Sequence, residues 1–108
     1  MDMTMSEKIL ARAAGRDAVS AGEIIWAKVD CALMDDILGP RVEIADLMKS
    51  GNRAIWDPNR VVIVSDHYTP PANARQAEIV KFTRDWAAEY GVKNYYEFAG
   101  PCHQVMVE

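Results

Sequence analysis

An aspartate and a histidine stand side by side one residue, Ser65, after a short apolar run. Asp66 and His67 follow the sequence RVVIV at residues 60–64, and the chain then reaches Pro70 and Pro71. Such a run of Val and Ile is typical of a strand buried in a parallel sheet, and ligands of open α/β sheets bind just past the carboxyl ends of such strands. A carboxylate beside an imidazole can orient the ring and hold its proton, which predicts an acid–base dyad. A solvated loop with two polar residues is the simpler alternative.

Two cysteines limit the metal chemistry that the chain can support alone. Cys31 and Cys102 are the only two, and neither belongs to a Cys-x-x-Cys pair. The chain therefore cannot supply the three or four thiolates that an iron–sulfur cluster requires, and we predict no metal ligand in it. We expect Cys31 to be a small core residue. Cys102 stands beside His103, so its role stays open between packing and reactivity.

Four segments, in order along the chain, resemble a known family. They are SEKILARAAG at residues 6–15, VDCALM at 29–34, VVIVSDHYTP at 61–70 and GPCHQV at 100–105. Together they are similar to the beginning of the large subunit of isopropylmalate dehydratase and, more widely, to the aconitase superfamily of hydro-lyases. Each motif is weak alone, but four in order with similar spacing are specific, and they cover nearly the whole chain.

This resemblance implies a reaction, a cofactor and partners. Members of the superfamily reversibly move water across a carbon–carbon double bond of a hydroxy-dicarboxylate or hydroxy-tricarboxylate, with a 4Fe-4S cluster as the Lewis acid. The cysteines of that cluster lie further along the subunit, so its ligands are not expected in this chain. The implied partners are the remainder of the large subunit and a small swivelling-domain subunit, which carries the serine base.

Three residues are implied to be catalytic. Asp66 and His67 match an Asp-His pair that acts on the substrate hydroxyl. Hydroxide is a poor leaving group, so dehydration needs a proton donor, a Lewis acid or both, and an oriented imidazole can be the donor. His103 lies in CHQ at residues 102–104, similar to a family element whose histidine reaches the substrate. A histidine hydrogen-bonded near a strand start is the alternative, and Pro101 replaces the family's aliphatic residue.

Asp35 and Asp36 are the expected substrate-binding residues. By the resemblance, Asp35 stands where the family has a His or Gln in contact with substrate. A carboxylate there repels a dicarboxylate unless it is protonated or paired with a cation, which indicates an unusual substrate or an altered activity. Asp36 matches an acidic residue that the family tolerates. The alternative for both residues is the solvated start of a helix.

The composition excludes some classes of partner. A net charge of -4 argues against nucleic acid and anionic membranes as partners. Both are negatively charged and bind basic protein surfaces, and this chain has an excess of acidic residues. No apolar run approaches the roughly 20 residues that cross a bilayer, and the amino end lacks the basic-then-apolar pattern of a signal peptide. We therefore expect a cytoplasmic protein.

The spacing of apolar residues predicts an α/β fold. Thr4 and Glu7 form a capping box for a first helix, which Gly15 can end. Further helices are expected over residues 31–38, 41–49 and 73–91, and strands over residues 24–29, 60–64, 95–98 and 104–108. This alternation indicates a small, largely parallel sheet of three to four strands flanked by helices. The resemblance implies that this sheet is part of an aconitase-type N-terminal domain.

The chain has material for one small core. The resemblance implies that residues 1–108 are a partial domain, incomplete relative to the family. A final strand at 104–108 would need a pairing partner, as in a truncated or split subunit. Two hypotheses remain open. The chain is a segment of an iron–sulfur hydro-lyase, as Asp66 and both histidines favour, or a non-catalytic α/β fragment or assembly module, as the missing cysteines and Asp35 favour.

Overall fold

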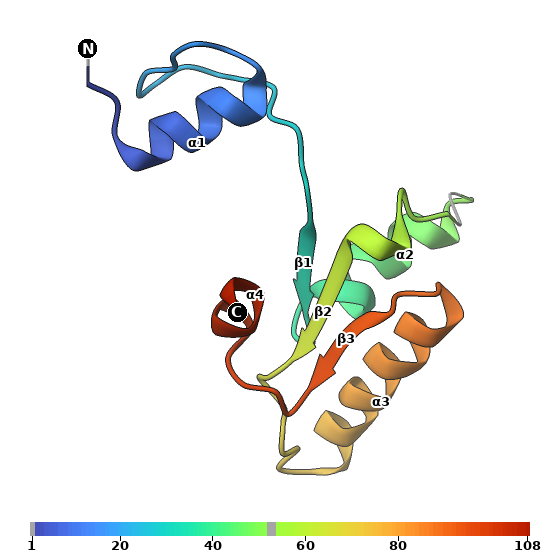
Figure 1. Cartoon of the computed structure of the whole chain (residues 1–108). Helices are drawn as coiled ribbons and strands as arrows, with labels where there is room; N and C mark the ends of the chain where they lie inside the picture. Colours follow the sequence, from blue (N-terminus) through green and yellow to red (C-terminus); the bar gives the residue numbers. More distant parts are fainter. Residues whose placement is uncertain (1, 52–53) are drawn as a thin grey trace. The chain divides into compact units, whose positions relative to one another are not determined.

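The computed structural model describes residues 2–51 and 54–108. The chain divides into two compact units, Met1–Asp30 and Cys31–Glu108 (Figure 1). The predicted site residues all belong to the second unit.

The first unit is built around helix α1 (Met5–Ala14). The predicted capping box is confirmed, because the Thr4 hydroxyl accepts from the Glu7 N–H while the Glu7 carboxylate accepts from the Thr4 N–H. Gly15 ends the helix at φ 65°, a left-handed conformation that suits glycine. The strand expected over residues 24–29 is wrong: this segment pairs with no strand, its Lys28 N–H donates to the Ala13 carbonyl of α1, and Trp26 is 96% exposed. Its composition is that of a strand, but the described part of this unit offers no neighbouring strand.

The second unit holds a parallel sheet of three strands, which confirms the predicted fold class. Strands β1 (Ala32–Asp35), β2 (Val61–Ser65) and β3 (Asn94–Glu97) lie in the order β1-β2-β3. Both pairings are parallel, with Leu33 beside Val62 and Val62 beside Asn94. The carboxyl ends of the three strands therefore meet at one edge of the sheet (Figure 1).

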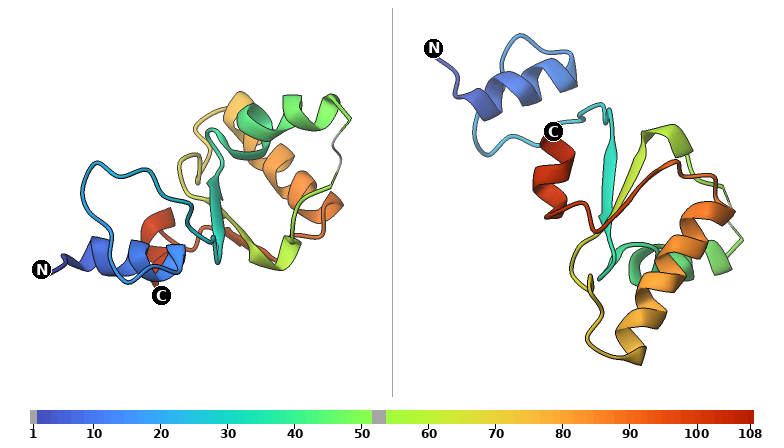
Figure 2. Two further views of the ribbon diagram at one scale, coloured as in Figure 1. Left: turned by 90° about the horizontal axis from the view of Figure 1, so that it is seen from above. Right: turned by 60° about the horizontal axis from the view of Figure 1, so that its bottom comes forward.

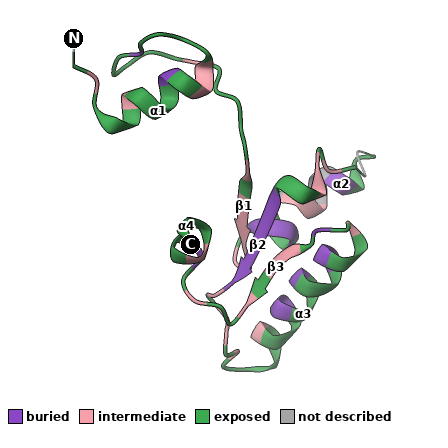
Figure 3. Cartoon of the chain, viewed as in Figure 1, coloured by how far each residue is buried: buried purple, intermediate pink, exposed green. Residues whose placement is uncertain are grey.

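All five residues of β2 are buried because both faces of the sheet are covered (Figure 3). On one face, Val61 and Ile63 pack with Met48 of α2 (Ala45–Lys49) and Trp86 of α3 (Ala74–Glu89). On the other face, Val62 and Val64 pack with Cys102 of α4 (Cys102–Val107), which lies opposite α2 and α3 (Figure 2). This two-sided burial explains the continuous apolar run of β2.

Three further elements differ from their prediction. The helix expected over residues 31–38 is instead β1 and a loop, because Ala32–Asp35 pairs with β2 and this pairing overrides local preference. The loop leads into a π-helical segment, η1 (Gly39–Ile44), and α2 continues it to Lys49. The helix expected over residues 41–49 therefore starts two residues earlier, at Gly39. The strand expected over residues 104–108 is α4. Cys102 and Val105, three residues apart, pack on the same face of the sheet, as a helix allows.

Helix α3 was correctly predicted. The Asn73 side chain accepts from the Gln76 N–H at 3.0 Å and caps its first turn. Ile79, Phe82, Trp86 and Tyr90 recur at spacings of three and four; Ile79 and Trp86 are buried and Tyr90 lies 4.6 Å from Trp86 between ring centroids, so these three pack in the core, whereas Phe82 is 40% exposed. None of the helices in the described ranges combines the length and apolar character that crossing a bilayer demands.

Candidate functional site

The candidate site lies at the carboxyl edge of the parallel sheet. Asp35 is the last residue of β1, and Asp36 follows it. Asp66 and His67 follow β2, the neighbouring strand. Because the strands are parallel and in register from Ala32 beside Val61, the two pairs of polar residues meet at the same edge.

A cavity of about 430 Å³ opens beside this edge. Its lining combines the β1 and β2 ends with the start of α4: Leu33, Met34, Asp35, Leu38, Asp66, His67, Pro101, Cys102 and His103. Four of the five predicted site residues therefore surround one cavity. Asp36 does not line it.

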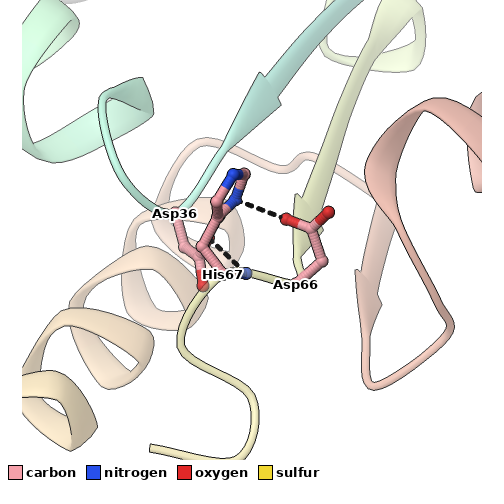
Figure 4. Close-up of side chains that lie close together, drawn as sticks. All are labelled: Asp36, Asp66 and His67. Carbon is pink, nitrogen blue, oxygen red and sulfur yellow. Dashed lines mark hydrogen bonds and ion pairs between the residues drawn. The ribbon is translucent and has the colours of Figure 1, made fainter.

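Asp66 connects two parts of this site, and Figure 4 shows its contact with His67. Its Oδ1 lies 2.7 Å from Nδ1 of His67, and its Oδ2 accepts from the Cys102 N–H at 2.5 Å. The second contact fixes the start of α4 and so brings His103 to the cavity. Burial alone would raise the pKa of Asp66, but donation from Cys102 and the attraction of His67 lower it, so the carboxylate is charged at neutral pH.

Asp36 lies behind the cavity and holds the loop after β2. Its side chain is fully buried, and its two oxygens accept from the backbone N–H groups of His67 and Tyr68, each at 3.2 Å. Its Oδ1 also lies 3.4 Å from Nδ1 of His67 (Figure 4). Asp36 was expected to bind substrate, but its carboxylate instead accepts hydrogen bonds from the backbone of His67 and Tyr68.

Asp35 lines the cavity while capping the loop that follows β1. Its Oδ1 accepts from the N–H groups of Ile37 at 2.9 Å and Leu38 at 3.0 Å. This Asx-type turn resembles the helix start that was weighed as an alternative, and it leads directly to η1. The side chain is therefore both a loop cap and a negative group beside the cavity.

The two cysteines pack in the core and do not fit an iron–sulfur cluster. Both are free, Cys102 is buried, and Cys31 packs beside it in the cluster under α4. Burial, followed by the nearby Asp66 carboxylate, raises the pKa of the Cys102 thiol. A thiol that stays protonated is a poor metal ligand and nucleophile. Cys31 and Cys102 therefore do not provide ligands for an iron–sulfur cluster.

Asp36, Asp66 and His67 could each offer one ligand atom to a cation, within 4.8 Å of one another. Both oxygens of Asp36 and one of Asp66 already accept backbone N–H groups. The contacts that the structure gives these side chains are hydrogen bonds from backbone N–H groups and the approach of Nδ1 of His67 to both carboxylates.

A polar network beside the site was not anticipated from the sequence. The Ser65 and Tyr95 hydroxyls are 3.2 Å apart, Tyr95 donates to Glu97 at 2.7 Å, and Glu97 accepts two hydrogen bonds from Arg84. Pairing with Arg84 lowers the pKa of Glu97. The available signal was that residues 95 and 97 alternate on β3 and so share one face. The network ties β3 and α3 to the last residue of β2.

The charge of the cavity bears on what it can bind. Among the described residues that line it, two are carboxylates and two are imidazoles, and none is Lys or Arg. Arg84 is held by Glu97, and Arg60 lies over the Trp56 ring beside Asp57. A dicarboxylate would need cations from groups outside this cavity lining.

Comparison with curated proteins finds relatives over the whole chain. It is 41% identical over 109 residues to the probable 3-isopropylmalate dehydratase large subunit of Methanothermobacter thermautotrophicus, which matches 100% of this chain and 26% of that protein. It is 42% identical over 110 residues to the 3-isopropylmalate dehydratase large subunit of Sulfurihydrogenibium sp., with 100% of this chain and 25% of that protein covered. The corresponding subunit of Moorella thermoacetica is 47% identical over 97 residues, which are 90% of this chain and 23% of that protein.

The chain spans about a quarter of the length of these curated relatives. No family model matches it. The parallel sheet and the full-length similarity agree with the resemblance of its four motifs. Over its whole length, the chain is thus a relative of the large subunit of 3-isopropylmalate dehydratase, within the aconitase superfamily.

Proposed function

We propose that this chain is a segment of a cytoplasmic iron–sulfur hydro-lyase that hydrates and dehydrates a hydroxy-dicarboxylic acid, as in isomerisation of an isopropylmalate-type substrate. One observation carries the proposal: Asp35, Asp66, His67 and His103 surround a single cavity at the carboxyl edge of the sheet. These residues come from distant parts of the sequence, and the fold collects them where α/β proteins bind ligands.

In this proposal His67 gives a proton to the departing hydroxyl and recovers it in the reverse reaction. Asp66 orients the ring through its contact with Nδ1 at 2.7 Å and stabilises the charged imidazolium. The low pKa of Asp66 favours this role, because the carboxylate must stay ionised while it faces the ring. His103 borders the same cavity from α4 and would contact the substrate.

The proposed enzyme needs groups that this chain does not provide. A 4Fe-4S cluster would be held by cysteines outside it, and we derive no step through that cluster. The remainder of a large subunit and a small subunit would complete the site and supply cations for the substrate carboxylates. Asp35 would then face a substrate carboxylate and select for a substrate or cation arrangement that tolerates its charge.

Native mass spectrometry of the chain, isolated anaerobically from its own source, tests the assembly. We expect the chain to travel with larger polypeptides and with the mass of an iron–sulfur cluster. In that complex, Asp66→Asn and His67→Ala should abolish most turnover, whereas Asp85→Asn, on the exposed side of α3, should not. A chain that travels alone at 12.1 kDa without metal would refute the proposal and support the non-catalytic module.

A further inference from the structure

Asp36 is the most deeply buried charged side chain at the site, although it does not reach the cavity. A buried carboxylate is costly unless donors satisfy it. Here the donors are the backbone N–H groups of His67 and Tyr68, at 3.2 Å each. Two donors from consecutive residues fix the direction of the backbone at His67, just after the chain leaves β2. The β1 end thereby determines where the imidazole stands.

The imidazole itself is placed between two carboxylates. Nδ1 lies 2.7 Å from Oδ1 of Asp66 and 3.4 Å from Oδ1 of Asp36 (Figure 4). Oδ1 of Asp66 is buried and accepts no hydrogen bond among the described residues, so Nδ1 of His67, 2.7 Å away, is the group beside it that could donate. A nitrogen lone pair facing two carboxylate oxygens would be repelled, so the proton of the neutral ring belongs on Nδ1. Nε2 has no hydrogen-bond partner within residues 2–51 and 54–108.

We propose that Asp36 is a positioning residue for His67. Its carboxylate fixes the backbone of residues 67 and 68 and acts with Asp66 to hold the ring proton on Nδ1, which leaves Nε2 as the atom that acts in the cavity. Only the catalytic consequence rests on the proposed hydro-lyase function. The placement of the ring and its proton can be tested without turnover.

Amide hydrogen exchange tests the backbone part on the full chain. Asp36→Asn keeps the shape of the side chain but replaces one acceptor oxygen by an NH₂ donor. Exchange at the His67 or Tyr68 amide should become about tenfold faster or more, as expected for the loss of one hydrogen bond. The matched control is Asp57→Asn, at the other end of β2, where Asp57 accepts from the Asn59 N–H. It should change exchange near Asn59 and leave His67 unaltered. Unchanged exchange at both His67 and Tyr68 in Asp36→Asn would overturn the proposal.

The ¹⁵N shifts of the His67 ring test the second part. In the wild-type protein, the neutral ring should carry its proton on Nδ1. In Asp66→Ala it should stay there, because Asp36 still faces Nδ1, and the Asp36→Asn, Asp66→Ala double variant should lose this preference. Loss of the preference in Asp66→Ala alone would show that Asp36 does not act on the ring. Wild type and Asp66→Ala decide this part even where Asp36→Asn fails to fold.

Turnover separates this inference from the proposed function. In the assembled enzyme, Asp36→Asn should lower kcat about tenfold or more and change KM much less, because the proton donor is misplaced while the substrate contacts remain. If KM rises by the same factor by which kcat falls, and the ring tautomer is unaltered, Asp36 is only a structural residue and the proposal is overturned. If the wild-type assembly turns over no hydroxy-acid, the proposed function fails, and the exchange and tautomer results still decide the role of Asp36.

Discussion

Replacing Asp66 by Asn should destabilise the protein at neutral pH by about 2 kcal/mol. The change removes the charge of the carboxylate that accepts a hydrogen bond from the Cys102 N–H at 2.5 Å. Hydrogen bonds to charged groups contribute about 1.5–3 kcal/mol to stability. The ion pair with His67 adds less, because that imidazole is 39% exposed and solvent screens it. Urea unfolding followed by fluorescence at pH 7 gives the free energy of unfolding of both proteins.

The same comparison at low pH checks the physical cause. The pKa of Asp66 lies below its ordinary value of 3.8: burial opposes this, and the Cys102 donors and His67 outweigh it. A carboxylate with a lowered pKa in the folded state stabilises the protein above its unfolded pKa and loses that contribution as pH falls through the folded value. The difference between wild type and Asp66→Asn should therefore shrink below about pH 4. A difference near zero at pH 7, or one that is the same at about pH 3, would refute the reasoning.

Three further perturbations have expected results. Ile63→Ala should cost about 2–5 kcal/mol in urea unfolding, because Ile63 is fully buried in the centre of the sheet. Tyr95→Phe should cost about 1–2 kcal/mol, because the buried Ser65 hydroxyl loses its partner. The Cys102 thiol, whose pKa is raised by burial, should react with a disulfide reagent more slowly than Cys31 in the folded chain, and the two rates should converge in urea.

Matched variants serve as controls for the two stability measurements. Ile24→Ala removes the same atoms from a side chain that is 97% exposed and should change stability by less than about 0.5 kcal/mol. Tyr96→Phe, on the exposed face of β3, should also be nearly neutral. Similar losses in a variant and its control would contradict the assigned burial. Faster labelling of Cys102 than of Cys31 would contradict its place in the core.

The position of Asp66 and His67 in the fold could be predicted from local sequence, because the composition of β2 indicates a strand buried on both faces. Its uninterrupted Val and Ile residues require cover on both faces, and this fixed the place of Asp66 and His67 at the carboxyl edge. Helix α3 was equally predictable, because its cap residue Asn73 and the spacing of Ile79, Trp86 and Tyr90 are local features of the sequence.

The errors fall on short segments whose structure depends on distant partners. Residues 32–35 become a strand only because β2 lies beside them, and residues 102–107 become a helix that seats Cys102 and Val105 on the sheet. The role of Asp36 was hidden for the same reason, since its acceptors meet amides 31 and 32 residues away. No periodicity of the sequence reports such a contact.

The most direct test of the central claim is turnover by the anaerobically assembled complex. Dehydration of isopropylmalate, followed by the absorbance of the unsaturated acid, should proceed with the wild-type chain and fall by about 10²-fold or more with His67→Ala, as expected for loss of a general acid. His103→Ala should also reduce turnover, because that ring borders the same cavity. An active complex that is indifferent to His67→Ala would contradict the assignment of this cavity as the place where the hydroxyl is handled.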